Sequence, residues 1–292
     1  MTTTISASDV KKLRDQTGAG MMDCKSALTE ADGNFEEATT ILRKKGLASA
    51  AKKAGRATDQ GLIGSRISAD HSTGTLVEVN CESDFVARTD EFKQLVEDVL
   101  TEIDKAGDAA TQAWLDNPDG PVKKRVAMTV GKLGENMAVP RFVRFTGKGY
   151  VGDYIHMGGK IGVQVELAGV TRQTSGQEAL AELVKQIAMH IAAASPSYVS
   201  RAAVPADVIE REKSIYRAQL EGKPANVLEK IIEGKLGSFY ASVPGGVLTD
   251  QPSIFDQKGK TSVADMIAAA SKALGAPVTV TRFARLKVGE GA

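Results

Sequence analysis

The chain has 292 residues, enough for two or three domains, and its formal net charge is +1 at pH 7. This charge balance argues against a nucleic-acid partner, which would call for a strongly basic surface. Neither a signal peptide nor an apolar run as long as a membrane span can be recognised. We therefore expect a cytoplasmic protein that binds neither membrane nor nucleic acid.

The first 56 residues predict a helical module. Ser6, with an acid three residues later, is typical of a helix start, and Gly18 marks the end of that helix. Apolar residues spaced three and four apart predict a second and a third helix, the third closed by Gly46. Residues 48–58, rich in Ala and Lys, predict a separate short helix that runs into a linker. The module is thus expected to be a bundle of three short helices with a small core.

The segment from Asn80 to Arg88 stands out because it carries an acid and a lone aromatic between a predicted strand and a predicted helix. Aromatic residues make up only 5% of the chain, so the position of Phe85 needs an explanation. One explanation is a core side chain that pins the helix to the strand. The other is a rigid aromatic wedge, flanked by charge, that is offered to a partner.

The chain contains an internal repeat. The pattern Gly61-Leu62-Ile63-Gly64 returns 88 residues later as Gly149-Tyr150-Val151-Gly152. Each copy predicts a β-hairpin followed by a helix, and each half ends on a further strand. The predicted hairpins, helices and closing strands cover residues 61–80, 90–103 and 141–145 in the first half and 149–168, 176–194 and 282–286 in the second. Two related α+β halves with antiparallel sheets are therefore expected.

The second half holds 53 more residues than the first between its helix and its closing strand. Apolar pairs recur there at heptad-like intervals on both sides of Glu221-Gly222-Lys223-Pro224. This pattern predicts an antiparallel helical hairpin over residues 198–248. Its apolar stripe is covered either within the hairpin or by another chain, and the sequence leaves both alternatives open.

Residues for covalent or metal chemistry are not found in any recognisable arrangement. The histidines His71, His156 and His190 have no Cys or acid pair at ligand spacing, and His190 is expected to be a buried core imidazole. Cys24 and Cys81 fall in different modules and are expected to be reduced and buried. No nucleophile elbow or phosphate loop is present. We expect a protein that is not an enzyme and that holds no cofactor or metal.

Two segments carry a resemblance to a known family. They are Thr17-Gly18-Ala19-Gly20-Met21-Met22-Asp23-Cys24-Lys25 and the segment from Asn80 to Arg88. Further matching segments follow in order: Gly134-Glu135-Asn136, Gly162-Val163, Ile187-Ala188-Met189-His190 and Gly222-Lys223-Pro224. Together these segments resemble elongation factor Ts, the nucleotide-exchange factor of translation elongation factor Tu.

The resemblance implies four units. They are a ubiquitin-associated-like helical module over 1–56, a first core half over 57–148, a second core half over 149–197 and 249–292, and a coiled-coil hairpin over 198–248. The hairpin would serve dimer contacts, so a homodimer is a possible partner state.

The resemblance also implies a guanine nucleotide exchange factor that promotes GDP release from elongation factor Tu and binds its GDP-bound and nucleotide-free forms. Asp84 and Phe85 would then form a wedge that enters the partner near its Mg²⁺ and phosphate site. Further positions that match partner contacts of the family are Lys25, Leu133, Gly134, His156, Ile254 and Phe255.

Two other classes of protein remain as alternatives. The first is an adaptor whose three-helix module binds partners and whose hairpin only oligomerises. The second is an RNA-binding translation protein, which the neutral charge opposes. The exposure of Phe85 separates exchange factor from adaptor, because a wedge must be accessible and a packing residue must be buried.

Overall fold

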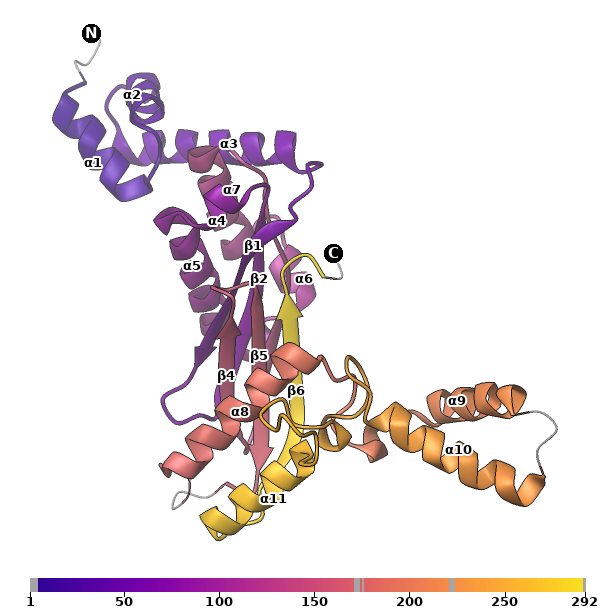
Figure 1. Cartoon of the computed structure of the whole chain (residues 1–292). Helices are drawn as coiled ribbons and strands as arrows, with labels where there is room; N and C mark the ends of the chain where they lie inside the picture. Colours follow the sequence, from indigo (N-terminus) through magenta and orange to yellow (C-terminus); the bar gives the residue numbers. More distant parts are fainter. Residues whose placement is uncertain (1–4, 171–173, 175, 221–223, 291–292) are drawn as a thin grey trace.

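The computed structural model describes residues 5–170, 174, 176–220 and 224–290. Three helices lie at one end, long antiparallel strands run through the middle, and a helical hairpin projects to the side (Figure 1). The predicted α+β class is confirmed. Among the described residues, no helix is long and apolar enough to cross a membrane.

The first three helices form a bundle around its own small core. They are α1 (Ala7–Thr17), α2 (Met21–Glu30) and α3 (Phe35–Lys53). Ser6 begins α1, since its side chain accepts a hydrogen bond from the main-chain N–H of Asp9 at 3.1 Å, and Gly18 ends it with φ +67°. The buried apolar residues of the bundle are Val10, Leu13, Cys24, Ala27, Leu28, Ala31 and Ala38.

The expectation that Gly46 closes the third helix is wrong. Helix α3 runs on to Lys53, so the separate short helix expected within residues 48–58 is the end of α3 itself. Gly46 lies where α3 meets α7 (Pro121–Leu133), and a Cβ there would be 3.1 Å from the carbonyl oxygen of Ala127. The glycine therefore permits close helix packing and does not mark a helix end.

Two three-stranded antiparallel sheets form the core, as the repeat predicted. The first has the order β1-β2-β3 and the second the order β4-β5-β6. The strands are β1 (Gln60–Ile67), β2 (Thr73–Cys81), β3 (Met137–Thr146), β4 (Tyr150–His156), β5 (Ile161–Ala168) and β6 (Thr279–Lys287). The two sheets lie against each other around Ile63, Leu76 and Leu286. Each sheet also has a register shift at the equivalent point of its central strand, after Glu78 and after Glu166.

Helices cover the outer face of each sheet. The first half carries α4 (Asp84–Ala87), α5 (Asp90–Ala106), α6 (Gln112–Asp116) and α7, and the second carries α8 (Glu178–Ala194) and α11 (Val263–Leu274). Short 3-10 turns lie at Gly107–Ala109, Arg201–Ala203 and Leu248–Asp250. Helix α7 was not predicted, although Pro121 at its first turn and Gly134 after its end are typical helix boundaries.

The repeat has a steric basis in one glycine per half. A Cβ on Gly64 would overlap the side chain of Val96 on α5, and a Cβ on Gly152 would overlap that of Val184 on α8. Both members of this contact recur at the 88-residue offset of the repeat. Each half thus needs a glycine where its long helix crosses its edge strand.

Each sheet also contains a buried carboxylate held by an arginine. Arg141 Nε lies 2.7 Å from Oε2 of Glu78, and Arg282 Nε lies 2.7 Å from Oε2 of Glu166. Glu78 is 1% exposed, and its second oxygen accepts a hydrogen bond from the N–H of Gly289 at 2.9 Å. A buried carboxylate without partners would strongly destabilise the folded protein. These contacts are therefore structural requirements of the fold.

The same arginines connect the two halves. Arg141 on β3 donates to the carbonyl oxygen of Lys287 on β6 at 3.1 Å, and Arg282 on β6 donates to the carbonyl oxygen of Thr146 on β3 at 2.9 Å. The halves are therefore joined by reciprocal hydrogen bonds as well as by apolar packing.

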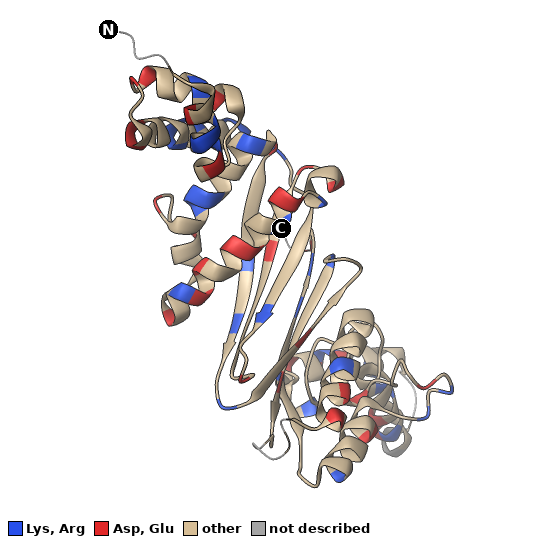
Figure 2. Cartoon of the chain, turned by 90° about the vertical axis from the view of Figure 1, so that its left-hand side faces the viewer, with Lys and Arg blue, Asp and Glu red and all other residues tan. Residues whose placement is uncertain are grey.

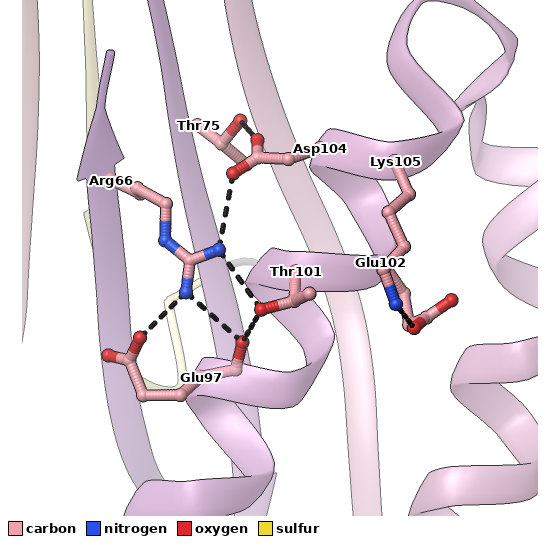
Figure 3. Close-up of polar contacts among 7 residues, drawn as sticks. All are labelled: Arg66, Thr75, Glu97, Thr101, Glu102, Asp104 and Lys105. Atoms are coloured by element: carbon pink, nitrogen blue, oxygen red, sulfur yellow. Dashed lines mark hydrogen bonds and ion pairs between the residues drawn. The ribbon is translucent and has the colours of Figure 1, made fainter. Parts of the chain in front are cut away.

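A polar cluster holds α5 against the first sheet (Figure 3). Arg66 on β1 pairs with Glu97 at 2.8 Å and with Asp104 at 3.3 Å. It also donates to Thr101, and Thr75 on β2 donates to Asp104 at 2.7 Å. Since α5 directly follows α4, this cluster contributes to fixing the segment that carries Phe85.

The predicted insertion is a helical hairpin made of α9 (Ala206–Gln219) and α10 (Ala225–Tyr240), which extends away from the second sheet (Figure 1). Pro224 precedes α10, whereas Glu221, Gly222 and Lys223 of the predicted turn lie outside the described residues. Ile232 and Leu236 of α10 are buried.

Substitution Gly152→Ala is expected to lower the free energy of unfolding by about 1–3 kcal/mol, because the added methyl overlaps Val184. Adding Val184→Ala should recover part of the loss, giving a double variant more stable than the sum of the single effects predicts. Chemical denaturation measures both. The control is Gly234→Ala on α10, where nothing lies within 4 Å and stability should rise by up to about 1 kcal/mol. Equal losses at the two glycines would contradict the steric account.

Candidate functional site

Phe85 is the most exposed large apolar side chain in the described part of the chain, at 79%. It lies on α4, a single turn between β2 and α5. The other side of this turn faces inward, since Ala87 is buried and Val86 packs on the core of the first half. The aromatic ring is thus presented to solvent by a turn whose opposite face is anchored.

Asp84 precedes Phe85 on α4, and the turn after α7 meets the start of α4. Oδ2 of Asp84 pairs with Arg88 one turn later at 2.6 Å. The turn after α7 contacts α4 directly, because the carboxylate of Glu135 accepts hydrogen bonds from Ser83. The structure therefore brings the turn that follows the predicted residues Leu133 and Gly134 to the start of α4, although Leu133 itself packs on the core of the first half. Gly134 ends α7 with φ +80° and is open to solvent.

His156 lies at the end of β4, on a turn that packs on the first half. The carbonyl oxygen of Gly159 in this turn accepts a hydrogen bond from the N–H of Ile63 at 2.7 Å. A surface groove of about 470 Å³ separates the turn from the start of α5. His156 is exposed, and its Nδ1 lies 2.9 Å from the hydroxyl of Tyr154. Its neighbour Met157 is 67% exposed.

Lys25 is exposed on α2, at the end of the molecule occupied by the three-helix bundle. The same helix exposes two apolar side chains, Met21 and Met22. The bundle lies beside the end of α7, where the Lys132 side chain approaches the turn at Gly18. Lys25 thus belongs to a second exposed surface, separate from α4.

Ile254 and Phe255 lie on a loop in the second half, apart from the other predicted residues. Both are partly exposed, at 43% and 45%. The imidazole of His190, which is fully buried on α8, forms hydrogen bonds with this loop and with the residue just before it. Its Nε2 lies 2.9 Å from Oε1 of Gln251, and its Nδ1 accepts from the N–H of Ile254 at 3.4 Å. The expectation of a satisfied core imidazole is confirmed.

Several residues around the site were not predicted from the sequence. Met22 and Met157 are exposed neighbours of Lys25 and His156, and the sequence pattern does not tell an exposed Met from a buried one. Glu82 and Glu135 hold the α4 turn, and neither was predicted to do so, although Glu82 lies in the segment from Asn80 to Arg88 and Glu135 in one of the segments that carry the resemblance. An acid placed directly before a capping serine or after a helix-ending glycine is the signal that was available.

The described residues contain no group of three or more potential metal ligands among His, Cys, Asp and Glu. Cys24 and Cys81 are free and buried, as expected. Burial raises the pKa of Cys24, and burial together with the charge of Glu135 raises the pKa of the Cys81 thiol to about 12. Both thiols are therefore harder to deprotonate than an ordinary cysteine. Acidic and basic residues are interspersed along the helices in Figure 2, consistent with the near-neutral net charge.

Comparison with known proteins adds a family to this geometry. The family model described as elongation factor TS matches residues 82–290. The chain is 46% identical to elongation factor Ts of Nautilia profundicola over 98% of this chain and 94% of that protein. The chain belongs to the elongation factor Ts family. Its identity to the elongation factor Ts proteins of Trichlorobacter lovleyi and Clostridium perfringens is 43% and 42%, in each case over 98% of this chain and 93% or 94% of the relative. The resemblance inferred from the sequence is thereby confirmed.

The free energy of unfolding is expected to depend on the protonation of His190. Burial lowers its pKa below the ordinary 6.5, although the hydrogen bond to Gln251 partly opposes this. The unfolded chain therefore binds the proton more readily, so stability is full above pH 6.5 and falls as the pH drops through 6.5 toward the lowered value.

Denaturant unfolding at a series of pH values between 8 and 5 measures this dependence. A His190→Gln variant, compared with the wild type, should show a shallower fall of stability below pH 6.5. Identical slopes in the two proteins would show that His190 does not carry the effect.

Proposed function

We propose that this protein is a guanine nucleotide exchange factor that promotes GDP release from elongation factor Tu during translation elongation. Membership of the elongation factor Ts family supports this role. The proposed mechanism rests on one observation, which is that Phe85 is exposed on a turn whose opposite face packs on the core. A core-packing role for this aromatic does not account for a side chain that is four-fifths exposed, which also counts against the adaptor alternative.

Phe85 acts in this proposal as a wedge. It inserts into the nucleotide-binding domain of the partner and disturbs the contacts that hold Mg²⁺ and phosphate. Such a site depends on a few desolvated charge contacts, so a small displacement weakens GDP binding strongly. The coupling is reciprocal, because a factor that weakens GDP binding is itself bound less tightly when nucleotide returns. The protein thus changes affinities and makes or breaks no bond.

The other predicted residues define how the wedge is aligned. Asp84 pairs with Arg88 in the free protein and can exchange this partner for a polar group of elongation factor Tu. Leu133 ends α7, and Gly134 follows it on the neighbouring turn, where the missing side chain allows a close approach of the partner's backbone. His156 extends the same surface across the groove beside α5.

Two more surfaces complete the proposed contact. Lys25, with the exposed methionines of α2, docks the helical module (1–56) on the partner's nucleotide domain. Ile254 and Phe255, in the second core half (149–197 and 249–292), hold the partner's other domains through apolar contacts. The first core half (57–148) carries the wedge between them.

Release of a fluorescent GDP from elongation factor Tu, followed by stopped flow, tests the wedge. The wild-type protein should accelerate release, and Phe85→Ala should reduce the acceleration about 30-fold, which corresponds to about 2 kcal/mol for a buried interface aromatic. The matched control is Val243→Ala, another exposed apolar residue, which should have no effect. Acceleration undiminished in Phe85→Ala would move the mechanism to other contacts. No acceleration by the wild type would favour the adaptor.

We also propose that the hairpin (198–248) forms homodimer contacts. Ile215 on α9 and Val227 on α10 are partly exposed, at 44% and 42%, on helices that project into solvent. Sedimentation velocity at increasing protein concentration should show a dimer, and Ile215→Glu should shift the equilibrium toward monomer by about tenfold or more. A monomer at all concentrations would leave the hairpin as a self-contained arm.

A further inference from the structure

The α4 turn cannot hold its own conformation. A helix of four residues lacks the cooperative hydrogen bonds that stabilise longer helices, so external contacts decide whether it forms. Moreover, burial of the Phe85 ring against neighbouring apolar surface would be favourable. Something must therefore keep the turn folded with its ring outward.

Glu135 supplies the contacts that the turn needs. The hydroxyl of Ser83 donates to Oε1 of Glu135 at 2.6 Å, and the main-chain N–H of Ser83 donates to Oε2 at 2.9 Å. Ser83 is also the N-cap of α4, because its Oγ accepts from the N–H of Val86 at 3.3 Å. Among the described residues, no cation forms an ion pair with Glu135. Its carboxylate is thus used entirely to hold the residue on which the turn begins.

Glu82 makes the complementary contact in the opposite direction. Its Oε1 accepts from the main-chain N–H of Asn136 at 2.5 Å and from Arg56 at 3.3 Å. Each of the two loops therefore provides a carboxylate to a main-chain N–H of the other. We call this set of contacts, formed by Glu82, Ser83, Glu135 and Asn136, the carboxylate clamp. The Asn136 side chain also donates to the carbonyl oxygen of Arg56, which ties in the segment after α3.

The second half of the core closes the equivalent corner without a carboxylate clamp. At the offsets of the repeat, Glu82 corresponds to Val170 and Glu135 to Ala276, neither of which can accept such bonds through its side chain. The corner is closed there by direct packing, since a Cβ on Gly169 would overlap the carbonyl oxygen of Pro277. The two halves share the sheet, its register shift and the long helix, but they differ at this corner. The carboxylates of Glu82 and Glu135 belong to the first half, which also carries the exposed Phe85.

We propose that Glu135 is a positioning residue that holds Phe85 in its outward orientation before the partner binds, with Glu82 as the second member of the clamp. This inference rests on the proposed exchange function. If only a fraction of molecules present the ring correctly, the apparent affinity for the partner falls by that fraction, whereas the rate within the saturated complex is unchanged. Glu135 therefore acts through Phe85 and contacts no nucleotide itself.

The test measures GDP release from elongation factor Tu as a function of the concentration of this protein. Glu135→Ala should raise the half-saturating concentration about tenfold and leave the maximal rate within about twofold of wild type. Glu135→Gln, which keeps one acceptor oxygen, should fall between the two. In a Phe85→Ala background, Glu135→Ala should cause no further loss, because the residue that it positions is gone. The matched control is Glu182→Ala, which removes an exposed helical carboxylate that accepts a hydrogen bond from Gln186.

A second measurement is independent of exchange. Amide hydrogen exchange of the free protein should speed up in Glu135→Ala at residues 83–89 and stay unchanged in the sheets. The assignment would be overturned if Glu135→Ala left either the hydrogen exchange or the half-saturating concentration unchanged. It would also be overturned if Glu135→Ala caused its full loss in the Phe85→Ala background. A wild-type protein that fails to release GDP would refute the proposed function, whereas the hydrogen-exchange result would still decide whether the clamp orders the turn.

Discussion

The buried Glu–Arg pair at the centre of each sheet is the interaction on which the rest of the core depends. A carboxylate in this position is tolerated only with full compensation, and both glutamates have it. The paired arginines also reach the backbone of the opposite sheet, so one network satisfies the charges and sets how the halves face each other. The surfaces that present Phe85 and His156 come from different halves. Their relative placement therefore depends on these two pairs.

An exposed aromatic on an ordered turn is a departure from what stability alone would favour. Elsewhere in the first half, apolar side chains are collected in a continuous core that reaches as far as Val86 and Ala87. Phe85, one residue before Val86, is instead exposed to solvent, and the polar contact between Ser83 and Glu135 holds the turn that carries it. Such local conflicts between folding and exposure are typical of functional sites.

Much of the fold was predictable because it depends on local patterns and on repetition. The hairpin-plus-helix units follow from glycine spacing and alternation, and the 88-residue offset preserves even the contact between Gly152 and Val184. The role of Gly46 was not predictable, since a glycine that ends a helix and one that admits a neighbouring helix look alike in sequence. Phe85 could be singled out as a candidate by its setting. The bond between Ser83 and Glu135 could not, because it joins residues 52 positions apart through tertiary packing.

The contact between Glu78 and Gly289 has a consequence for synthesis on the ribosome. The two residues are 211 positions apart, and β6, which supplies much of the compensation for the second sheet, lies just before Gly289. At typical translation rates this separation corresponds to about 10 to 40 s of elongation. During that interval the nascent first sheet has a carboxylate without its final partner. Completion of the core is therefore a late event relative to synthesis of the first sheet, even though the first three helices emerge early and have a core of their own.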